Sequence, residues 1–242
     1  DLFRFIETVF SQYLQSETLG LNEVALELLG EGKKDFEFKK EKMREDEWKN
    51  YFEYNLQDSI LTFKLAEKFW PDMLEFTRII QEPLFEVTRD GMSQLVENYI
   101  IHNLGRFNEI IQKRPVHNEI QERREREKYE GAFVLQPNPG LYENLAIFDF
   151  TSYWPSIIVT FNLSAATFLG ESKTEKDALE VKVGEKKFYF LRKRGFFPEM
   201  LEEIIELRKK YKQDYAKNKN PITKARSNAY KLLANASYGY QG

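Results

Sequence analysis

Cysteine is absent from this 242-residue chain, and histidine occurs only twice. The chain therefore has no disulfide framework and no thiolate metal site, which fits an intracellular protein. The two histidines, His102 and His117, stand far apart and show none of the spacings of a zinc site. No apolar run reaches the roughly 18 residues of a membrane span, so we expect no membrane partner.

An initiating methionine and a signal-peptide pattern are also missing. The chain begins at Asp1 and stops at Gly242, and we expect it to be an excerpt of a longer protein or one half of a split one. With 42% hydrophobic and 15% aromatic residues, it can bury the core of one or two domains.

There is no overall excess of positive charge. The formal net charge of −3 by itself argues against a nucleic-acid-binding protein. Residues 207–231, however, carry nine Lys and Arg against Asp214 alone. Such a local basic element can bind phosphate on an otherwise acidic protein, and the alternative is a solvated basic face without a ligand.

Apolar residues recur at helical spacing through much of the N-terminal half. This pattern predicts helices within residues 1–29, interrupted by a loop at 16–21, and over 51–70, 72–80 and 93–111, with Pro71 between the helices over 51–70 and 72–80. Tyr54 and Asp58 are four residues apart and therefore share a helical face. A packed tyrosine beside a solvated acid is the ordinary explanation of such a pair.

The stretch AIFDFTSYWPSII, residues 146–158, places one acid at the end of an apolar run. We predict a buried strand that ends at Asp149, then a helix whose first turn contains Pro155, because proline has no N–H to donate. The helix start leaves unpaired N–H groups near Tyr153 and Trp154. A carboxylate beside such donors suits a metal-bound polyphosphate; the alternative is that Asp149 is the N-cap of the helix.

The pattern after this helix predicts a β-hairpin and then two helices. Alternating residues around Gly184 and Glu185 are typical of a hairpin. Residues 199–217 and 223–237 are helical in pattern, and the short polar turn between them predicts an antiparallel helical hairpin.

The two helices of this hairpin each carry polar side chains on one face. Arg208 and Lys212 are four residues apart on the first helix, and Lys231, Asn235 and Tyr238 follow at helical spacing on the second. If the hairpin closes, these cations and the amide can converge on one triphosphate.

Several of these segments resemble one protein family. DFTSYWPSII resembles motif A of the family B DNA polymerases, and KLLANASYGYQG resembles their motif B, in the family's order and at about its spacing. YNLQDSILTFKLA resembles the third exonuclease motif of these polymerases, and Tyr129-Glu-Gly-Ala resembles a motif that contacts template DNA. The chain is thus similar to an archaeal-type polymerase with 3′–5′ proofreading, from the end of the exonuclease domain to motif B.

The resemblance implies an α+β fold with a mostly helical N-terminal part, an antiparallel palm sheet carrying Asp149 and an antiparallel two-helix fingers hairpin. It divides the chain into the C-terminal part of the exonuclease domain (1–80), a helical linker to the palm (81–128), the first part of the palm with motif A (129–169), a hairpin insertion between palm and fingers (170–194) and the fingers with motif B (195–242).

The implied activity is template-directed nucleotidyl transfer from a dNTP to a primer 3′-hydroxyl by two-metal catalysis, with Mg²⁺, or Mn²⁺ in its place. By the resemblance, Asp149 and the Phe150 carbonyl bind metal, and Lys231 is catalytic beside Asp149. The resemblance assigns nucleotide binding to Tyr153, Trp154, Arg208, Lys212, Lys231, Asn235 and Tyr238. It assigns Tyr54 and Asp58 to the exonuclease site and DNA contacts to Tyr129, Gly131 and Ala132.

Two features depart from the family pattern. The second catalytic carboxylate, in a D-T-D motif, should lie downstream of motif B and is not in this sequence, so we expect the isolated chain to be inactive. Trp154 stands where the family has Tyr, and Tyr153 stands where it usually has Leu. Because Trp keeps a large aromatic ring, we expect ribonucleotides still to be rejected; the alternative is that the change marks drift in a paralogue that no longer polymerises.

The implied partners are primer–template DNA, dNTPs, a sliding clamp and the remainder of the polymerase. That remainder, on the same chain or on a second polypeptide, would supply the downstream carboxylate and the thumb. The implied location is the cytoplasm or nucleoid of a prokaryote, or the nucleus of a eukaryote.

A catalytically inactive, polymerase-like scaffold that binds DNA or partner subunits is the alternative to an enzyme. An inactivated copy would be expected to lose some of the four motif residues Asp149, Lys231, Asn235 and Tyr238. All four are present, which favours the enzyme.

Overall fold

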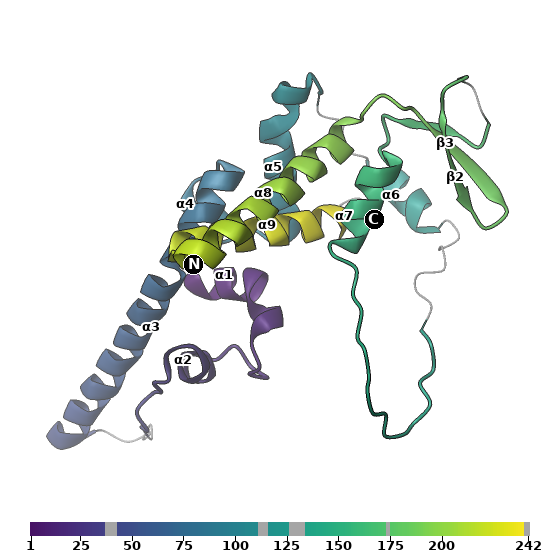
Figure 1. Ribbon diagram of the computed structural model, residues 1–242. Helices are drawn as coiled ribbons and strands as arrows, with labels where there is room; N and C mark the ends of the chain where they lie inside the picture. The colour runs from purple at the N-terminus through teal and green to yellow at the C-terminus, as the bar shows by residue number, and fades with distance from the viewer. Residues whose placement is uncertain (37–42, 111–115, 126–133, 173–174, 240–242) are drawn as a thin grey trace.

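The computed structural model describes residues 1–36, 43–110, 116–125, 134–172 and 175–239, and most of them are helical (Figure 1). The elements follow in the order α1 Leu2–Val9, η1 Ser11–Tyr13, α2 Leu21–Leu29, α3 Glu45–Ile80, α4 Leu84–Val87, α5 Met92–Asn103, η2 Leu104–Phe107, α6 His117–Glu125, α7 Tyr153–Phe161, β1 Phe168–Gly170, β2 Leu179–Val183, β3 Lys186–Phe190, α8 Phe196–Asn218 and α9 Pro221–Gly239. The predicted α+β class is confirmed. No helix within these ranges is both long enough and apolar enough to cross a lipid bilayer.

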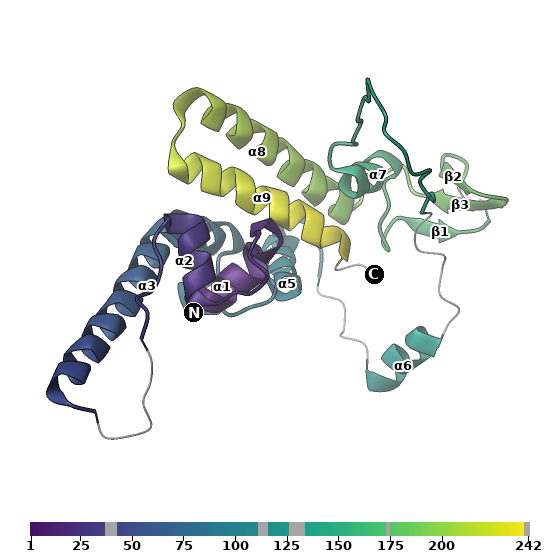
Figure 2. The same ribbon diagram turned by 90° about the horizontal axis from the view of Figure 1, so that it is seen from below.

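The pair α8–α9 occupies the middle of the molecule. The two helices lie side by side and run in opposite directions, joined by a short turn (Figure 1 and Figure 2), as the sequence predicted. Helices α3 and α5 pack against α9, and the N-terminal half of α3 projects as an arm with α2 beside it. Helix α7 contacts the other end of the pair, next to the sheet.

Helix α3 runs unbroken through Pro71, so the prediction of two helices over residues 51–70 and 72–80 is wrong. A proline inside a helix costs about 3 kcal/mol, because it removes a hydrogen bond and crowds the preceding turn. The residues on both sides of Pro71 nevertheless face one core, and Phe69 and Phe76 are both buried there. Each such side chain stabilises the fold by about 1.5–3 kcal/mol, so joint packing of the two halves outweighs the break.

One hydrophobic core joins the N-terminal helices to α8 and α9. Its fully buried side chains include Phe5 of α1, Phe76 of α3, Leu95 of α5, Leu201 of α8 and Leu233 of α9. Phe5 meets Phe76 edge to face, with ring centroids 5.8 Å apart. Because α9 shares this core with α1 and α3, the C-terminal helix pair is held against the N-terminal part of the chain.

An ion pair adds a polar link between α3 and α9. Nη2 of Arg226 donates to Oε1 of Glu75 at 2.8 Å, and its Nε donates to the other carboxylate oxygen. The guanidinium also lies over the Tyr211 ring, 4.8 Å from its centroid. The hydrogen bonds to Glu75 raise the pKa of Arg226, so the arginine keeps its charge. Because Glu75 is buried, removing only one partner would cost about 3–5 kcal/mol.

The sheet has the strand order β1-β3-β2 and is antiparallel. Strands β2 and β3 form the hairpin predicted from the sequence, with Val183 opposite Lys186. Gly184 has φ +59°, the left-handed conformation that a two-residue hairpin turn requires. The sheet lacks the strand expected before Asp149, since all its residues come after α7.

Asn162, the C-cap of α7, ties that helix to the start of α8. It is buried and has φ 53°. Its Nδ2 donates to the carbonyls of Leu191 and Lys193 at 2.7 and 2.9 Å. Its Oδ1 accepts a hydrogen bond from the N–H of Gly195 at 2.9 Å. One amide side chain thus satisfies three backbone groups in the connection from β3 to α8.

We predict that Gly195→Ala destabilises the protein, because a Cβ at this position would lie 2.6 Å from Cγ2 of Thr167. The φ of Gly195 is −81°, which any residue adopts, so the penalty is steric. Overpacking of this kind costs about 1–3 kcal/mol, measurable as a lower midpoint of urea denaturation. Gly91→Ala is the matched control, since Gly91 is also a helix N-cap and nothing lies within 4 Å of its Cβ. Equal destabilisation by both substitutions would contradict this packing.

A pocket of about 300 Å³ lies between η1, α3 and the start of α9, and Asp72, Lys68 and Lys224 are among its lining residues. Burial raises the pKa of Asp72 from 3.8 to about 6, and the charge of Lys224 offsets this effect only in part. Lys68 is engaged elsewhere, because its Nζ donates to the Leu28 carbonyl at 2.8 Å. The ionised form of Asp72 is therefore less favourable in the folded protein than in the unfolded chain.

We predict that Asp72→Asn stabilises the protein at pH 7.5 and has little effect near pH 4. The folded-state pKa lies above the unfolded value, so the unfolded chain binds fewer protons between about pH 4 and 6, and the free energy of unfolding falls as pH rises through that window. Each pKa unit corresponds to about 1.4 kcal/mol, so the gain at pH 7.5 is at most about 3 kcal/mol. Urea unfolding at the two pH values measures it. The same effect at both would show that Asp72 titrates normally.

Candidate functional site

Residues 134–150 approach α7 as a long exposed loop and form no strand (Figure 1). The predicted buried strand ending at Asp149 is therefore wrong for the described chain, in which Ile147 is 86% and Phe148 is 92% exposed. An apolar run forms a strand only beside another strand that accepts its hydrogen bonds, and β1, β2 and β3 pair among themselves. Asp149 is exposed near the end of this loop and makes no hydrogen bond or ion pair with another described residue.

Helix α7 begins at Tyr153, and its N-cap is Ser152, whose φ of 51° turns the chain into the helix. Asp149 is therefore not the N-cap, which was the alternative explanation of its position. The first backbone hydrogen bond of the helix runs from the N–H of Ser156 to the carbonyl of Ser152 at 2.9 Å. The N–H groups of Tyr153 and Trp154 precede this bond and point toward the N-terminal end of α7, as the sequence predicted.

Motif A and motif B meet through an aromatic stack. The rings of Trp154 and Tyr238 lie 4.6 Å apart and are parallel to within 6°. The Tyr153 ring lies 5.0 Å from Trp154, and the Phe150 ring lies 5.2 Å from Tyr153. Trp154 is 46% and Tyr238 36% exposed, so the stack has a surface that a planar ligand can reach.

Helix α8 reaches the same segment through a cation. Nη1 of Arg208 donates to Oγ of Ser152 at 2.9 Å. A guanidinium has five N–H donors, so this contact leaves others for an anionic ligand. Arg208 thus lies at the N-terminal end of α7, beside the segment that carries Asp149.

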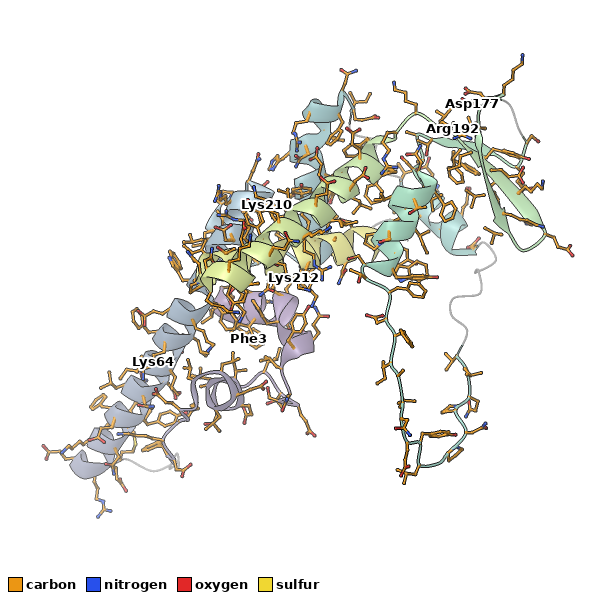
Figure 3. The ribbon with its side chains drawn as sticks, viewed as in Figure 1. Phe3, Lys64, Asp177, Arg192, Lys210 and Lys212 are labelled. Carbon is orange, nitrogen blue, oxygen red and sulfur yellow. The ribbon has the colours of Figure 1, made fainter. Side chains whose placement is uncertain are left out.

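The side chains of the other predicted nucleotide-binding residues form no hydrogen bond or ion pair with the N-terminal end of α7 as described. The side chains of Lys212 and Asn235 are exposed and form no hydrogen bond or ion pair with the rest of the described chain. Lys212 leaves α8 on a different side from Lys210 (Figure 3). Lys231 is half-buried, and its Nζ lies 4.8 Å from the centroid of the Tyr13 ring, in the N-terminal part. Sequence reasoning missed Tyr13, because one aromatic residue in a short turn indicates nothing about a helix at the other end of the chain.

Tyr54 and Asp58 share one face of α3, as predicted, and both contact Lys33. Nζ of Lys33 lies 2.8 Å from Oδ2 of Asp58 and 4.9 Å from the centroid of the Tyr54 ring. The hydrogen bond to Asp58 raises the pKa of Lys33, which favours two opposite charges here. Oδ1 of Asp58 is buried without a hydrogen-bond partner among the described residues. Sequence reasoning did not single out Lys33, which lies in a charged turn without a motif.

The predicted DNA-contacting residues Tyr129, Gly131 and Ala132 lie outside the described part of the chain.

The Asp149 carboxylate and the Phe150 carbonyl are oxygen donors of the type that Mg²⁺ prefers, so they fit one side of a magnesium site. Within the ranges that the structure describes, no three His, Asp or Glu side chains gather closely enough to hold a metal ion. The remaining ligands of such a site must come from other groups.

Comparison with known proteins agrees with the two motifs. Residues 83–242 match the family model described as DNA polymerase family B. The chain is 35% identical over 193 residues to DNA polymerase 1 of Pyrococcus abyssi and 37% identical over 194 residues to a DNA polymerase of Pyrococcus glycovorans. Each of these alignments covers 78% of this chain and 24% of the relative, so the chain spans about a quarter of the length of these curated relatives.

Its fold is also similar to a solved structure, that of the family B DNA polymerase from the hyperthermophilic archaeon Pyrobaculum calidifontis. The TM-score is 0.66 at 29% sequence identity, and the match covers 82% of this chain and 26% of that one. The match of the family model over most of the chain, together with these relatives, shows that the chain belongs to DNA polymerase family B.

Proposed function

We propose that this chain is part of a template-directed DNA polymerase, in which motifs A and B form two walls of one nucleotide site. The observation that carries the proposal is the contact between the motifs, the stack of Trp154 on Tyr238. The hydrogen bond from Arg208 to Ser152 brings a cation from α8 to the same place. An aromatic surface beside a guanidinium and a free carboxylate suits a nucleoside triphosphate with its metal.

In this proposal Asp149 and the carbonyl of Phe150 hold a metal ion, with Mg²⁺ or Mn²⁺ as the ion. When bound, the metals supply charge neutralisation at the triphosphate and activation of the primer 3′-hydroxyl. The chain contributes an exposed carboxylate that no described cation neutralises. A second carboxylate is to come from the remainder of the polymerase.

The triphosphate itself is bound by the fingers helices. Arg208 and Lys212 of α8, together with Lys231 and Asn235 of α9, are the proposed contacts. A guanidinium grips phosphate as a fork, and an ammonium acts as a point charge. Lys231 is proposed to offset charge, or to donate a proton, at the leaving phosphate, and closure of the helices is proposed to exclude water.

The stacked rings are proposed to contact the sugar and base. Trp154 forms the surface under the sugar, where a 2′-hydroxyl would collide with the indole ring, and Tyr153 borders it. Tyr238 is proposed to pack near the nascent base pair. This arrangement predicts preference for deoxyribonucleotides.

Residues 1–80 are proposed as the C-terminal part of a 3′–5′ proofreading exonuclease domain, with Tyr54 and Asp58 in its site. A metal ion there must compete with Lys33 for the Asp58 carboxylate.

Residues 81–128 are proposed as the linker to the palm, 129–169 as the first part of the palm, 170–194 as a hairpin insertion and 195–242 as the fingers. The proposed partners are primer–template DNA, dNTPs, a sliding clamp and the remainder of the enzyme, acting on DNA inside the cell.

The test is primer extension by the native full-length or partner-complemented polymerase, compared with its Asp149→Asn variant. We expect the wild type to extend a primer with Mg²⁺ and dNTPs, and much less with ribonucleotides. Loss of this carboxylate should reduce the rate by at least about a hundredfold, the lower end for one positioned catalytic group. Glu143→Gln is the matched control, because Glu143 is an exposed acid on the same loop. Absence of extension by the DNA-bound wild type would favour the scaffold alternative.

A further inference from the structure

One face of α9 carries a continuous row of polar side chains. Lys224, Asn228, Lys231, Asn235 and Tyr238 follow at intervals of four and three residues, which places them on a single side of the helix. The row has two different neighbours. Its C-terminal end meets α7 through Tyr238, whereas its middle meets η1 through Lys231.

The contact in the middle joins motif B to the N-terminal part of the chain. Nζ of Lys231 lies 4.8 Å from the centroid of the Tyr13 ring, within the range of a cation–π interaction. Among the described residues no carboxylate pairs with Lys231, so the aromatic face is the partner of its charge. Tyr13 is held in place through its turn, because the neighbouring Phe10 packs on Phe69 of α3 with ring centroids 4.6 Å apart.

Open space adjoins Lys231 at this contact. A pocket of about 340 Å³ is lined by Phe10, Tyr13, Asn228, Lys231 and Leu232. The contact is also weak enough to exchange, because a cation–π interaction at a partly exposed site changes an equilibrium roughly two- to fivefold. A triphosphate, with several negative charges, is a stronger partner for an ammonium than a neutral ring is.

We propose that Tyr13 is a positioning residue for Lys231. It holds the ammonium on the side of α9 that faces the N-terminal part while no nucleotide is bound, and it competes with the triphosphate for Lys231. A residue located before α3 thereby sets the nucleotide affinity of motif B. The inference rests on the proposed function, since it takes the triphosphate as the competing ligand.

The chain offers a matched control for this contact. The ring of Tyr215 on α8 lies 5.3 Å from Nζ of Lys219 and 6.0 Å from Nζ of Lys224, so it forms the same kind of interaction without Lys231. Tyr13 itself is 48% exposed, so its replacement opens no core cavity. Tyr13→Phe retains the ring face and serves as the conservative variant.

The experiment uses the native full-length or partner-complemented polymerase with Tyr13→Leu, Tyr13→Phe or Tyr215→Leu. Two quantities are measured: the KM for dNTP in single-nucleotide extension, and the rate of acylation of Lys231, followed by mass spectrometry with and without dNTP. We expect Tyr13→Leu to lower KM roughly two- to fivefold with kcat unchanged, and to speed acylation because the ring no longer shields the amine. Tyr13→Phe and Tyr215→Leu should behave as the wild type.

The outcomes separate this inference from the proposed function. If dNTP protects Lys231 in the wild type but Tyr13→Leu changes neither KM nor acylation, the role of Tyr13 is overturned and the nucleotide site stands. If dNTP does not protect Lys231 of the wild type from acylation and the wild type does not extend a primer, the proposed function fails and the role of Tyr13 fails with it. A lower KM in Tyr215→Leu as well would show a general charge effect and would also overturn the inference.

Discussion

The geometry of the proposed nucleotide site depends on the buried side chain of Asn162. This single amide satisfies three backbone groups between β3 and α8 while it ends α7. Arg194 also links the start of α8 to α7, because its Nη1 donates a hydrogen bond to the Val159 carbonyl of α7 at 2.6 Å. Left unpaired, the buried N–H of Gly195 would by itself cost about 1–3 kcal/mol. Helix α7 is therefore fixed to the start of α8, and this fixes the distance from motif A to Arg208.

A second constraint links the site to the N-terminal part of the chain. The Glu75–Arg226 pair and the shared hydrophobic core hold α9 against α3. Arg226 lies more than one helical turn before Lys231 on α9. Because α9 is fixed at this end, Lys231 faces Tyr13, while Tyr238 at the other end faces α7. A helix shared between two neighbours in this way connects the N-terminal part of the chain, which we propose belongs to an exonuclease domain, with the proposed nucleotide site.

The sequence predicted those features that depend on local pattern. Helical periodicity gave the α8–α9 pair, and the residues around Gly184 gave the β2–β3 hairpin. The prediction of a strand before Asp149 was wrong, because an apolar run does not reveal whether a neighbouring strand is available. The prediction of a helix break at Pro71 was also wrong, because tertiary packing outweighed a local preference. The Lys33–Asp58 pair and the Tyr13–Lys231 contact could not be predicted, since both depend on how distant segments pack.

The central claim is that motifs A and B form one site, and a double-mutant cycle on Trp154 and Tyr238 tests it most directly. The measured quantity is kcat/KM for dNTP with the native polymerase, its Trp154→Ala and Tyr238→Ala variants and the double variant. If the two rings act as one surface, the effects are non-additive, with a coupling energy of about 0.5–1.5 kcal/mol. Effects that add to within about 0.3–0.5 kcal/mol would show two independent rings and would contradict the account.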